Sequence, residues 1–182
     1  YFRHQYPSAD ATYKTITNGY DPQDWSNIQP IQRDPHLFWI VHTGAFSISR
    51  SGTSRSPQTL LLAIDHLEDD IRSKLRLVLV GALTEQEHTL IHQLGLDDAV
   101  QEIGQVNHQT SLAYQMAADV LLLMVGKDRS VATSKLYEYL YTRRPILAIS
   151  APDTAAAAIV QQTGAGRSVS PDEPQEVAAV LK

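Results

Sequence analysis

The chain of 182 residues is 43% hydrophobic, which suits one globular domain with a sizeable core. Its formal net charge is -5, and no segment gathers the lysines and arginines that a nucleic-acid backbone requires, so we expect no nucleic-acid partner. The absence of cysteine excludes disulfides and thiolate metal sites and is typical of a cytosolic protein. The apolar runs are too short to span a bilayer, and the first residues, which lack Met, resemble no signal peptide. We expect a piece of a longer protein.

The first 35 residues are polar and rich in turn-forming residues. A short β-prone run at residues 13–17 stops at Asn18 and Gly19, a pair typical of turns. We therefore predict a connecting segment over residues 1–35, followed by a folded domain over residues 36–182.

From there the chain alternates between strands and helices. Patterning predicts strands at residues 37–43, 75–80, 99–103, 120–125, 146–149 and 167–169. It predicts helices at residues 57–67, 84–94, 110–118, 134–142, 154–163 and 174–181. Thr84 and Glu87 have the spacing of a capping box, and Gly95 follows the end of that helix. The strands are nearly continuous runs of Val, Leu and Ile, which is typical of a parallel sheet covered on both faces. We predict a Rossmann-like α/β domain.

The loop after the first predicted strand, residues 42–57, is one candidate phosphate site. Gly44 lets the backbone turn tightly, and Arg50 and Arg55 supply cations near a helix start, where anions are favoured. Pro57 suits the first helical position, which places Arg55 just ahead of it. The loop lacks both the G-x-G-x-x-G pattern and a Walker lysine. Composition alone leaves a mobile surface loop equally open.

The helix predicted at residues 134–142 carries a second candidate. Helical spacing places Leu136 and Tyr139 on one face, with Ser134 and Glu138 together on the other. Ser134 or Thr133 would cap the helix, and a carboxylate one turn in can accept two ribose hydroxyls while the free amides hold a phosphate. Spacing alone nevertheless favours a solvated glutamate stabilised by the helix dipole.

Two histidines, His88 and His92, lie at i and i+4 and could share a metal ion. No glutamate follows His88 in the H-E-x-x-H arrangement and no third ligand is evident, so we expect a solvated helix face and no metal. The remaining acidic pairs, Asp69–Asp70 and Asp97–Asp98, are interpreted as loop and helix-end charges. No serine sits in a G-x-S-x-G turn, so the sequence contains no self-sufficient catalytic set.

Five stretches follow one another in a recognisable order: ITNGYDPQDW, FWIVHTGAF, LRLVLVGA, EIGQVNHQTSLAYQMAADVLLLMV and SKLYEYLYTRRPILAI. Together they resemble the carboxy-terminal half of the two-domain retaining glycosyltransferases of group 1 (family 4). The last stretch matches the most specific signature, K-L-x-E-Y-L-x-x-x-(K/R)-P-I-L-A. The resemblance implies one half of a GT-B fold, with residues 1–35 as the interdomain linker and residues 36–182 as the donor domain.

The resemblance implies that this half binds a nucleotide-diphosphate sugar. Glu138 would hold the ribose hydroxyls, and the amides around Ser134 and Lys135 would meet the diphosphate. The acceptor site and the groups nearest the reaction centre belong to the amino-terminal half of the family, so no catalytic residue is expected here.

Two further positions carry donor-binding roles by resemblance, and two depart from the family. Arg55 would face the same phosphates near Gly44, and the backbone at Val106 would lie near the base. The family often has a second glutamate eight positions before the conserved one, where this chain has Ser130, and an arginine where it has Ala45. Both departures concern the donor sugar rather than the nucleotide.

The function expected from the resemblance is sugar transfer from a nucleotide-diphosphate sugar to a glycan, a lipid-linked acceptor or another acceptor, as in cell-envelope polysaccharide synthesis. Amides at the helix start, with Arg55 and Lys135, would stabilise charge on the leaving diphosphate, and no metal or other cofactor is expected. We expect a cytoplasmic protein in which any contact with the inner face of the membrane is made by the missing half. The fragment alone is expected to be inactive.

Three alternatives stay open. A nucleotide-sugar epimerase or a phosphorylase shares the two-domain architecture, but its catalytic carboxylates or cofactor lysine cannot be located here. A non-catalytic nucleotide-binding or receiver-like module is also open. A receiver-like module would require clustered acidic residues at the carboxyl end of the first strand, where this chain has His42, Thr43 and Gly44. A structural remnant without donor binding is compatible with Ser130.

Overall fold

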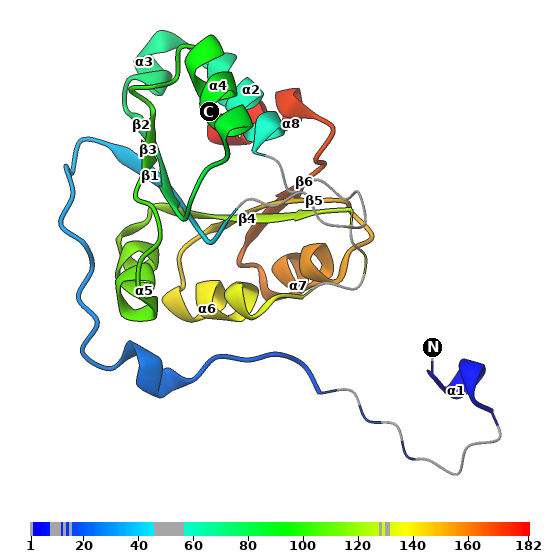
Figure 1. Ribbon diagram of the computed structural model, residues 1–182. Coiled ribbons are helices and arrows are strands. Elements are labelled where there is room, and N and C mark those ends of the chain that lie inside the picture. Colours follow the sequence, from blue (N-terminus) through cyan, green and yellow to red (C-terminus); the bar gives the residue numbers. More distant parts are fainter. Residues whose placement is uncertain are drawn as a thin grey trace.

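The chain forms a six-stranded parallel sheet with helices on both faces (Figure 1). The computed structural model describes residues 2–7, 12, 14, 16–45, 57–127, 129 and 132–182. The strands are β1 (Phe38–Thr43), β2 (Leu75–Val80), β3 (Val100–Glu102), β4 (Val120–Gly126), β5 (Ile146–Ser150) and β6 (Gly166–Val169). They lie in the order β3-β2-β1-β4-β5-β6, which is a Rossmann-like arrangement. The predicted fold class is confirmed.

Helices cover the two faces of this sheet in separate groups (Figure 1). One face carries α2, α4 and α8, and the opposite face carries α5, α6 and α7. The described helices are α1 (Phe2–Gln5), α2 (Gln58–Asp65), α3 (Asp69–Arg72), α4 (Glu85–Gln93), α5 (His108–Ala117), α6 (Ser134–Thr142), α7 (Ala155–Thr163), α8 (Pro174–Leu181) and the 3-10 turn η1 (Pro22–Trp25).

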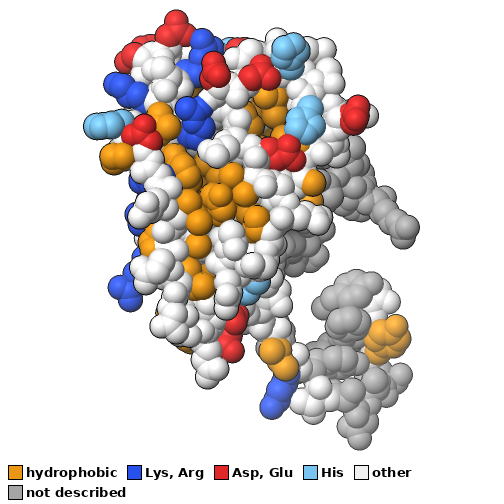
Figure 2. All heavy atoms as spheres, turned by 60° about the vertical axis from the view of Figure 1, so that its left-hand side comes forward, with side chains coloured by type: hydrophobic (Ala, Val, Ile, Leu, Met, Phe, Trp, Pro, Cys, Tyr) orange, Lys and Arg blue, Asp and Glu red, His pale blue; other side chains and the backbone are white. Residues whose placement is uncertain are grey.

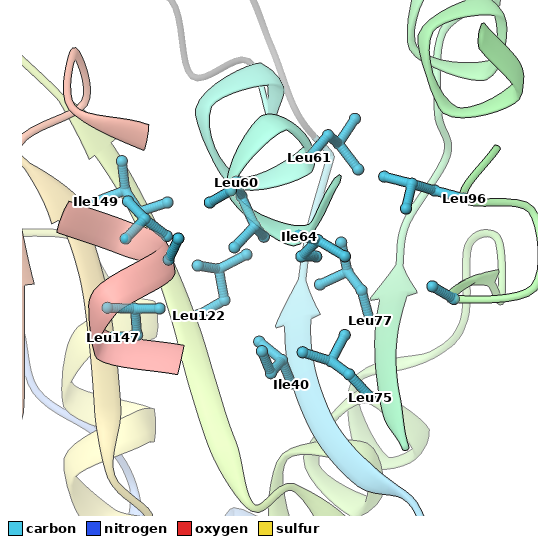
Figure 3. Packing of buried hydrophobic residues seen from close by; sticks show 14 of the residues in the cluster. Ile40, Leu60, Leu61, Ile64, Leu75, Leu77, Leu96, Leu122, Leu147 and Ile149 are labelled. Atoms are coloured by element: carbon cyan, nitrogen blue, oxygen red, sulfur yellow. The ribbon is translucent and has the colours of Figure 1, made fainter. Parts of the chain in front are cut away.

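The core consists of two apolar clusters, one on each face of the sheet, because successive strand residues point to opposite faces. In β1, Ile40 belongs to the cluster under α2, whereas Trp39 and Val41 belong to the other. Figure 3 shows the first cluster, in which Leu60 and Ile64 of α2 lie over the sheet. Strands buried on both faces explain why their sequences read as continuous apolar runs.

Local signals explain most element boundaries. Thr84 and Glu87 form the predicted capping box at the start of α4, and Gly95 has a positive φ of 63° after its end. Helix α5 begins two residues before its predicted start, because the Asn107 side chain accepts a hydrogen bond from the Thr110 amide. The short helix α3 was not expected, since Asp69 and Asp70 were interpreted as loop and helix-end charges and instead form its first turn.

The segment before β1 runs beneath the α5 and α6 side of the domain (Figure 1). Trp25 of η1 is buried, its ring 4.8 Å from that of Tyr141 on α6, and the Ile31 amide donates to the Ala113 carbonyl on α5. The strand predicted at residues 13–17 lies partly outside the described residues. Its described members and the Asn18–Gly19 pair adopt neither strand nor turn. The boundary between residues 35 and 36 stays a prediction.

Charged side chains of both signs are interspersed on the surface drawn in Figure 2, around a central hydrophobic area. In the parts of the chain that the structure describes, none of the helices combines the length and the apolar composition needed to cross a bilayer.

Candidate functional site

The strand order makes the carboxyl ends of β1 and β4 a topological switch point, the position at which open α/β sheets form a ligand crevice, and we refer to this position as the crevice. These strands are hydrogen-bonded neighbours in the middle of the sheet. The chain leaves β1 toward α2 on one face and leaves β4 toward α6 on the other. Ligands of open α/β sheets bind where the connections diverge in this way. The candidate residues Gly44 and Ser134 both follow one of these two strands.

Gly44 brings two backbone segments and the Lys135 side chain together at the end of β1. Its φ is +111°, and its amide donates to the Val80 carbonyl at the end of β2 over 2.8 Å. A Cβ atom at Gly44 would contact Nζ of Lys135, and one at Gly81 would lie 2.5 Å from the Gly44 carbonyl oxygen. The turn therefore requires glycine, and it places the Lys135 ammonium beside the β1 turn.

The first turn of α6 offers an electropositive helix start. Thr133 is the N-cap residue, one of the two expected, with extended backbone angles, but its side chain makes no capping hydrogen bond within the described part of the chain. The aligned peptide dipoles and the Lys135 ammonium thus favour an anion next to Gly44. Arg50, Arg55 and Ser130 lie outside the described residues, so their predicted roles stay predictions.

Glu138 lies one turn into α6 and is held in place by its neighbours. Its Oε2 accepts a hydrogen bond from Nε2 of Gln115 over 3.0 Å, and its Oε1 lies 3.5 Å from Nε2 of His108. Its side chain is 22% exposed, whereas that of His108 is 53% exposed. The carboxylate is therefore a partly buried group at the rim of the crevice, in contrast to the solvated glutamate that spacing alone favoured.

Buried hydroxyls connect Glu138's helix to β1. The Thr43 amide donates to the Tyr139 hydroxyl over 3.1 Å, and that hydroxyl donates to the Leu122 carbonyl on β4 over 3.3 Å. Burial raises the pKa of Tyr139 from 10.0 to about 12; the hydrogen bonds of Thr43 lower it, and the charge of Glu138 raises it further. The hydroxyl consequently stays protonated at neutral pH, and these contacts fix α6 against β1 and β4.

Val106 lies in the loop between β3 and α5, two residues before His108. Its side chain is partly buried against the cluster under α5 and α6. His108, two residues further along, contacts Glu138, and the role of the Val106 backbone near the base stays a prediction. The structure thus brings Gly44, Lys135 and Glu138 together through the contacts of Lys135 with Gly44 and of Gln115 with Thr43 and Glu138.

Sequence reasoning did not single out Thr43, His108 or Gln115 as members of this site. One signal for Gln115 was present: it follows Leu112 by three residues, on a helix face that otherwise buries apolar side chains. A polar residue on such a face needs a buried partner. Which partner it has depends on elements that lie elsewhere in the sequence.

The two histidines considered as metal ligands each lie close to a different carboxylate. His88 lies 3.2 Å from Glu102, and His92 lies 3.3 Å from Asp97. In the described part of the chain, no three histidine, aspartate or glutamate side chains converge as metal ligands would.

A cavity of about 710 Å³ lies at the other edge of the sheet, between β6, α7 and α8. Arg167, Ser168 and Glu176 contribute to its lining, and the buried Ser150 hydroxyl beside it is paired with that of Thr154 over 2.5 Å. It shares no residue with the crevice between β1 and β4. We assign the candidate site to the crevice, because strand topology, the helix start and the held carboxylate coincide there.

The chain was compared with known families and proteins. The family model of the glycosyl transferases group 1 matches residues 44–182. No curated protein matches the chain at a significant level. Among solved structures, the chain is similar to WaaG, a glycosyltransferase involved in lipopolysaccharide biosynthesis, with a TM-score of 0.72 and 16% identity over 99% of this chain and 49% of that one.

Two further solved structures have the same fold. HepE from Anabaena, solved in complex with UDP and glucose, has a TM-score of 0.70 and 18% identity over 92% of this chain and 46% of that one. The C-terminal domain of LpcC, a group 1 family glycosyltransferase from Francisella tularensis, has a TM-score of 0.65 and 18% identity over 90% of this chain and 86% of that one. The chain thus spans about half the length of WaaG and HepE and most of the LpcC domain. Since the family model covers strands β2 to β6 and helices α2 to α8, the chain belongs to the group 1 glycosyltransferases.

Proposed function

We propose that this chain is the donor-binding domain of a glycosyltransferase and that it binds a nucleotide-diphosphate sugar in the crevice between β1 and β4. One observation carries the proposal: the Glu138 carboxylate is held by Gln115 one helical turn from the helix start whose Lys135 side chain reaches Gly44. A carboxylate and an electropositive helix start side by side match the hydroxyls and the phosphates of one nucleotide.

The ribose role of Glu138 follows from the geometry of its two oxygens. Oε2 accepts from Gln115, whereas Oε1 lies 3.5 Å from Nε2 of His108, whose side chain is exposed. An ionised carboxylate accepts hydrogen bonds and donates none, so ribose hydroxyls are suitable partners for it. Ser134 precedes Glu138 by four residues, about 6 Å along the helix axis, which separates the phosphate end from the ribose end of the ligand.

The diphosphate would lie against the start of α6. There the helix dipole, the amides of Ser134 and Lys135 and the Lys135 ammonium supply positive potential, to which Arg55 would add a second cation. These groups would stabilise the charge that develops on the leaving diphosphate as its bond to the sugar breaks. Such donors replace a metal ion, and we propose that donor binding requires no metal.

The transfer itself would need a second domain. WaaG and HepE are about twice as long as this chain, and HepE was solved with UDP and glucose bound. We propose that an amino-terminal domain supplies the acceptor site, and that the chain alone binds the donor without turnover. The involvement of WaaG in lipopolysaccharide biosynthesis favours an acceptor of the cell envelope.

Calorimetric titration of the 182-residue chain with UDP, GDP, ADP and dTDP tests the proposal. At least one of them should bind, and Glu138→Ala should weaken it by about 10- to 100-fold, the value of hydrogen bonds to a charged group. Glu85→Ala, which removes an exposed glutamate from α4, is the control and should leave the affinity unchanged.

Three outcomes would contradict parts of this assignment. Failure of all four nucleotides to bind at millimolar concentration would refute the donor-domain function. Unchanged affinity in Glu138→Ala would refute the ribose role. A requirement for Mg²⁺, seen as loss of binding in EDTA, would refute metal-free binding. For Arg55→Ala, we expect weaker diphosphate binding with unchanged nucleoside affinity.

A further inference from the structure

A fully buried glutamine connects the candidate site to the centre of the sheet. Gln115 of α5 is 0% exposed, and its Nε2 lies 3.0 Å from Oε2 of Glu138 and 3.3 Å from Oγ1 of Thr43. The other end of the same amide, Oε1, is buried and has no hydrogen-bond partner among the described residues. The Nε2 end of this amide thus makes two hydrogen bonds, whereas the Oε1 end makes none among the described residues.

This arrangement is unfavourable if Gln115 serves packing alone. Burying an amide oxygen without a partner costs free energy, and a methionine or leucine of similar size would fill the same space without that cost. Thr43 does not require the amide either, because its hydroxyl also lies 3.3 Å from the Tyr139 hydroxyl. The contact with Glu138 is therefore the one that explains a glutamine here.

The orientation of the amide is decided by charge. With Nε2 toward Glu138, both N–H groups point at oxygen acceptors on α6 and β1. The reverse orientation would place the amide oxygen against an ionised carboxylate, which is repulsive. Gln115 consequently holds Oε2 of Glu138 from the buried side and leaves Oε1 toward the exposed His108.

We propose that Gln115 is a positioning residue for the donor site: it holds the Glu138 carboxylate in the orientation that accepts the ribose hydroxyls. This inference rests on the proposed function, because it acts through Glu138. A carboxylate held before the ligand arrives loses less side-chain freedom on binding, so the ligand binds more tightly. The effect belongs to the nucleoside part of the ligand and leaves the diphosphate part alone.

The test is a double-mutant cycle with Gln115→Met, Glu138→Ala and the combined variant. Each protein is titrated with whichever of UDP, GDP, ADP and dTDP binds most tightly, and separately with inorganic pyrophosphate. We expect Gln115→Met to weaken the nucleotide by about 3- to 10-fold, the value of a single hydrogen bond, and to leave pyrophosphate affinity unchanged. In the Glu138→Ala background, Gln115→Met should change nucleotide affinity by less than about 2-fold, because the group it positions is gone. Gln109→Met, which replaces an exposed glutamine of the same helix, is the matched control and should change neither affinity.

The possible results distinguish the positioning role of Gln115 from the ribose role of Glu138. If Glu138→Ala weakens the nucleotide but Gln115→Met does not, the positioning role is refuted and the ribose role stands. Equal losses from Gln115→Met with and without Glu138, or an equal loss for pyrophosphate, would mean a general disturbance of the fold and would also refute it. If Glu138→Ala has no effect, the proposed function fails and the positioning role fails with it. Unfolding in urea should show that Gln115→Met stays folded, because the hydrogen bond lost by Glu138 is offset in part by removal of the buried, unpartnered Oε1.

Discussion

Asn18 in the amino-terminal segment donates a hydrogen bond to the backbone carbonyl of Ala132, 114 residues later, over 2.8 Å. Ala132 lies two residues before the first residue of α6. At the other end of that helix, the rings of Tyr20 and Trp25 lie 4.7 and 4.8 Å from that of Tyr141. The segment that leads into the domain thus contacts both ends of the helix that carries Glu138, so a movement of this segment would reach the candidate site.

We expect Asn18→Ala to loosen the approach to α6 and to weaken diphosphate binding by about 2- to 5-fold, while the free energy of unfolding falls by only about 0.5–1.5 kcal/mol, the value of one hydrogen bond. Titration with pyrophosphate and urea unfolding measure the two quantities. Gln23→Ala changes the same segment at an exposed side chain and is the control. Equal pyrophosphate affinity in all three proteins would show that Asn18 does not act on the site.

Gly44→Ala should damage both stability and binding. The positive φ of 111° costs a residue with a Cβ atom about 1–3 kcal/mol, and the new methyl group would push the Lys135 ammonium away from the turn. Gly95→Ala has a comparable backbone cost at φ +63°, in open space after α4. In urea both variants should unfold more easily than the original chain, whereas only Gly44→Ala should lose affinity for pyrophosphate. Equal affinities in the two glycine variants would exclude a role for this turn in anion binding.

The buried Tyr139 hydroxyl predicts a specific dependence of stability on alkaline pH. Its pKa is about 12 in the folded chain and 10.0 when unperturbed, so between these values the unfolded chain releases the proton more readily. The contribution of Tyr139 is therefore fully present below pH 10 and is lost as the pH rises toward 12, by at most about 1.4 kcal/mol per pH unit.

Urea unfolding of the original chain and of Tyr139→Phe between pH 8 and pH 12 isolates this contribution, because the other tyrosines and the lysines are common to both. Tyr139→Phe leaves the buried Thr43 amide without its hydroxyl partner and should cost about 1–3 kcal/mol at neutral pH. The difference between the two proteins should shrink above pH 10. A difference that stays constant across this range would contradict the raised pKa.

Asp119, the aspartate of the A-D-V-L-L stretch, should matter for stability and not for binding. One of its oxygens accepts from the Trp39 amide over 2.8 Å and the other pairs with Arg33 over 2.6 Å, at the amino end of β1 and away from the crevice. We expect Asp119→Ala to lower the free energy of unfolding by about 1–3 kcal/mol because the buried amide loses its acceptor. The affinity of the folded protein for nucleotide should not change.

Asp172→Ala is the control for this variant, because Asp172 and its partner Lys127 form an exposed pair. Such pairs contribute about 0–1 kcal/mol, so the control should unfold almost as the original chain does. A loss of nucleotide affinity in Asp119→Ala under conditions where the variant is folded would contradict a purely structural role.

Sequence patterning by itself determined the elements of this fold. Continuous apolar runs and local caps, such as Thr84 with Glu87, depend on residues close together in the chain, so the predicted strands and longer helices agree with the structure to within a few residues. The helical period also placed Ser134 and Glu138 on one face of α6. These patterns involve no distant partner.

The tertiary structure alone decided what surrounds Glu138. Spacing favoured a solvated glutamate, and only the packing of α5 beside α6 brings Gln115 to it across 23 residues, as the packing of α5 on β1 brings Thr43 to Gln115 across 72. The strand order, the contact of Lys135 with Gly44 and the bond from Asn18 to Ala132 are of the same kind. Each depends on which apolar faces pack together, a property of the whole core and not of any local pattern.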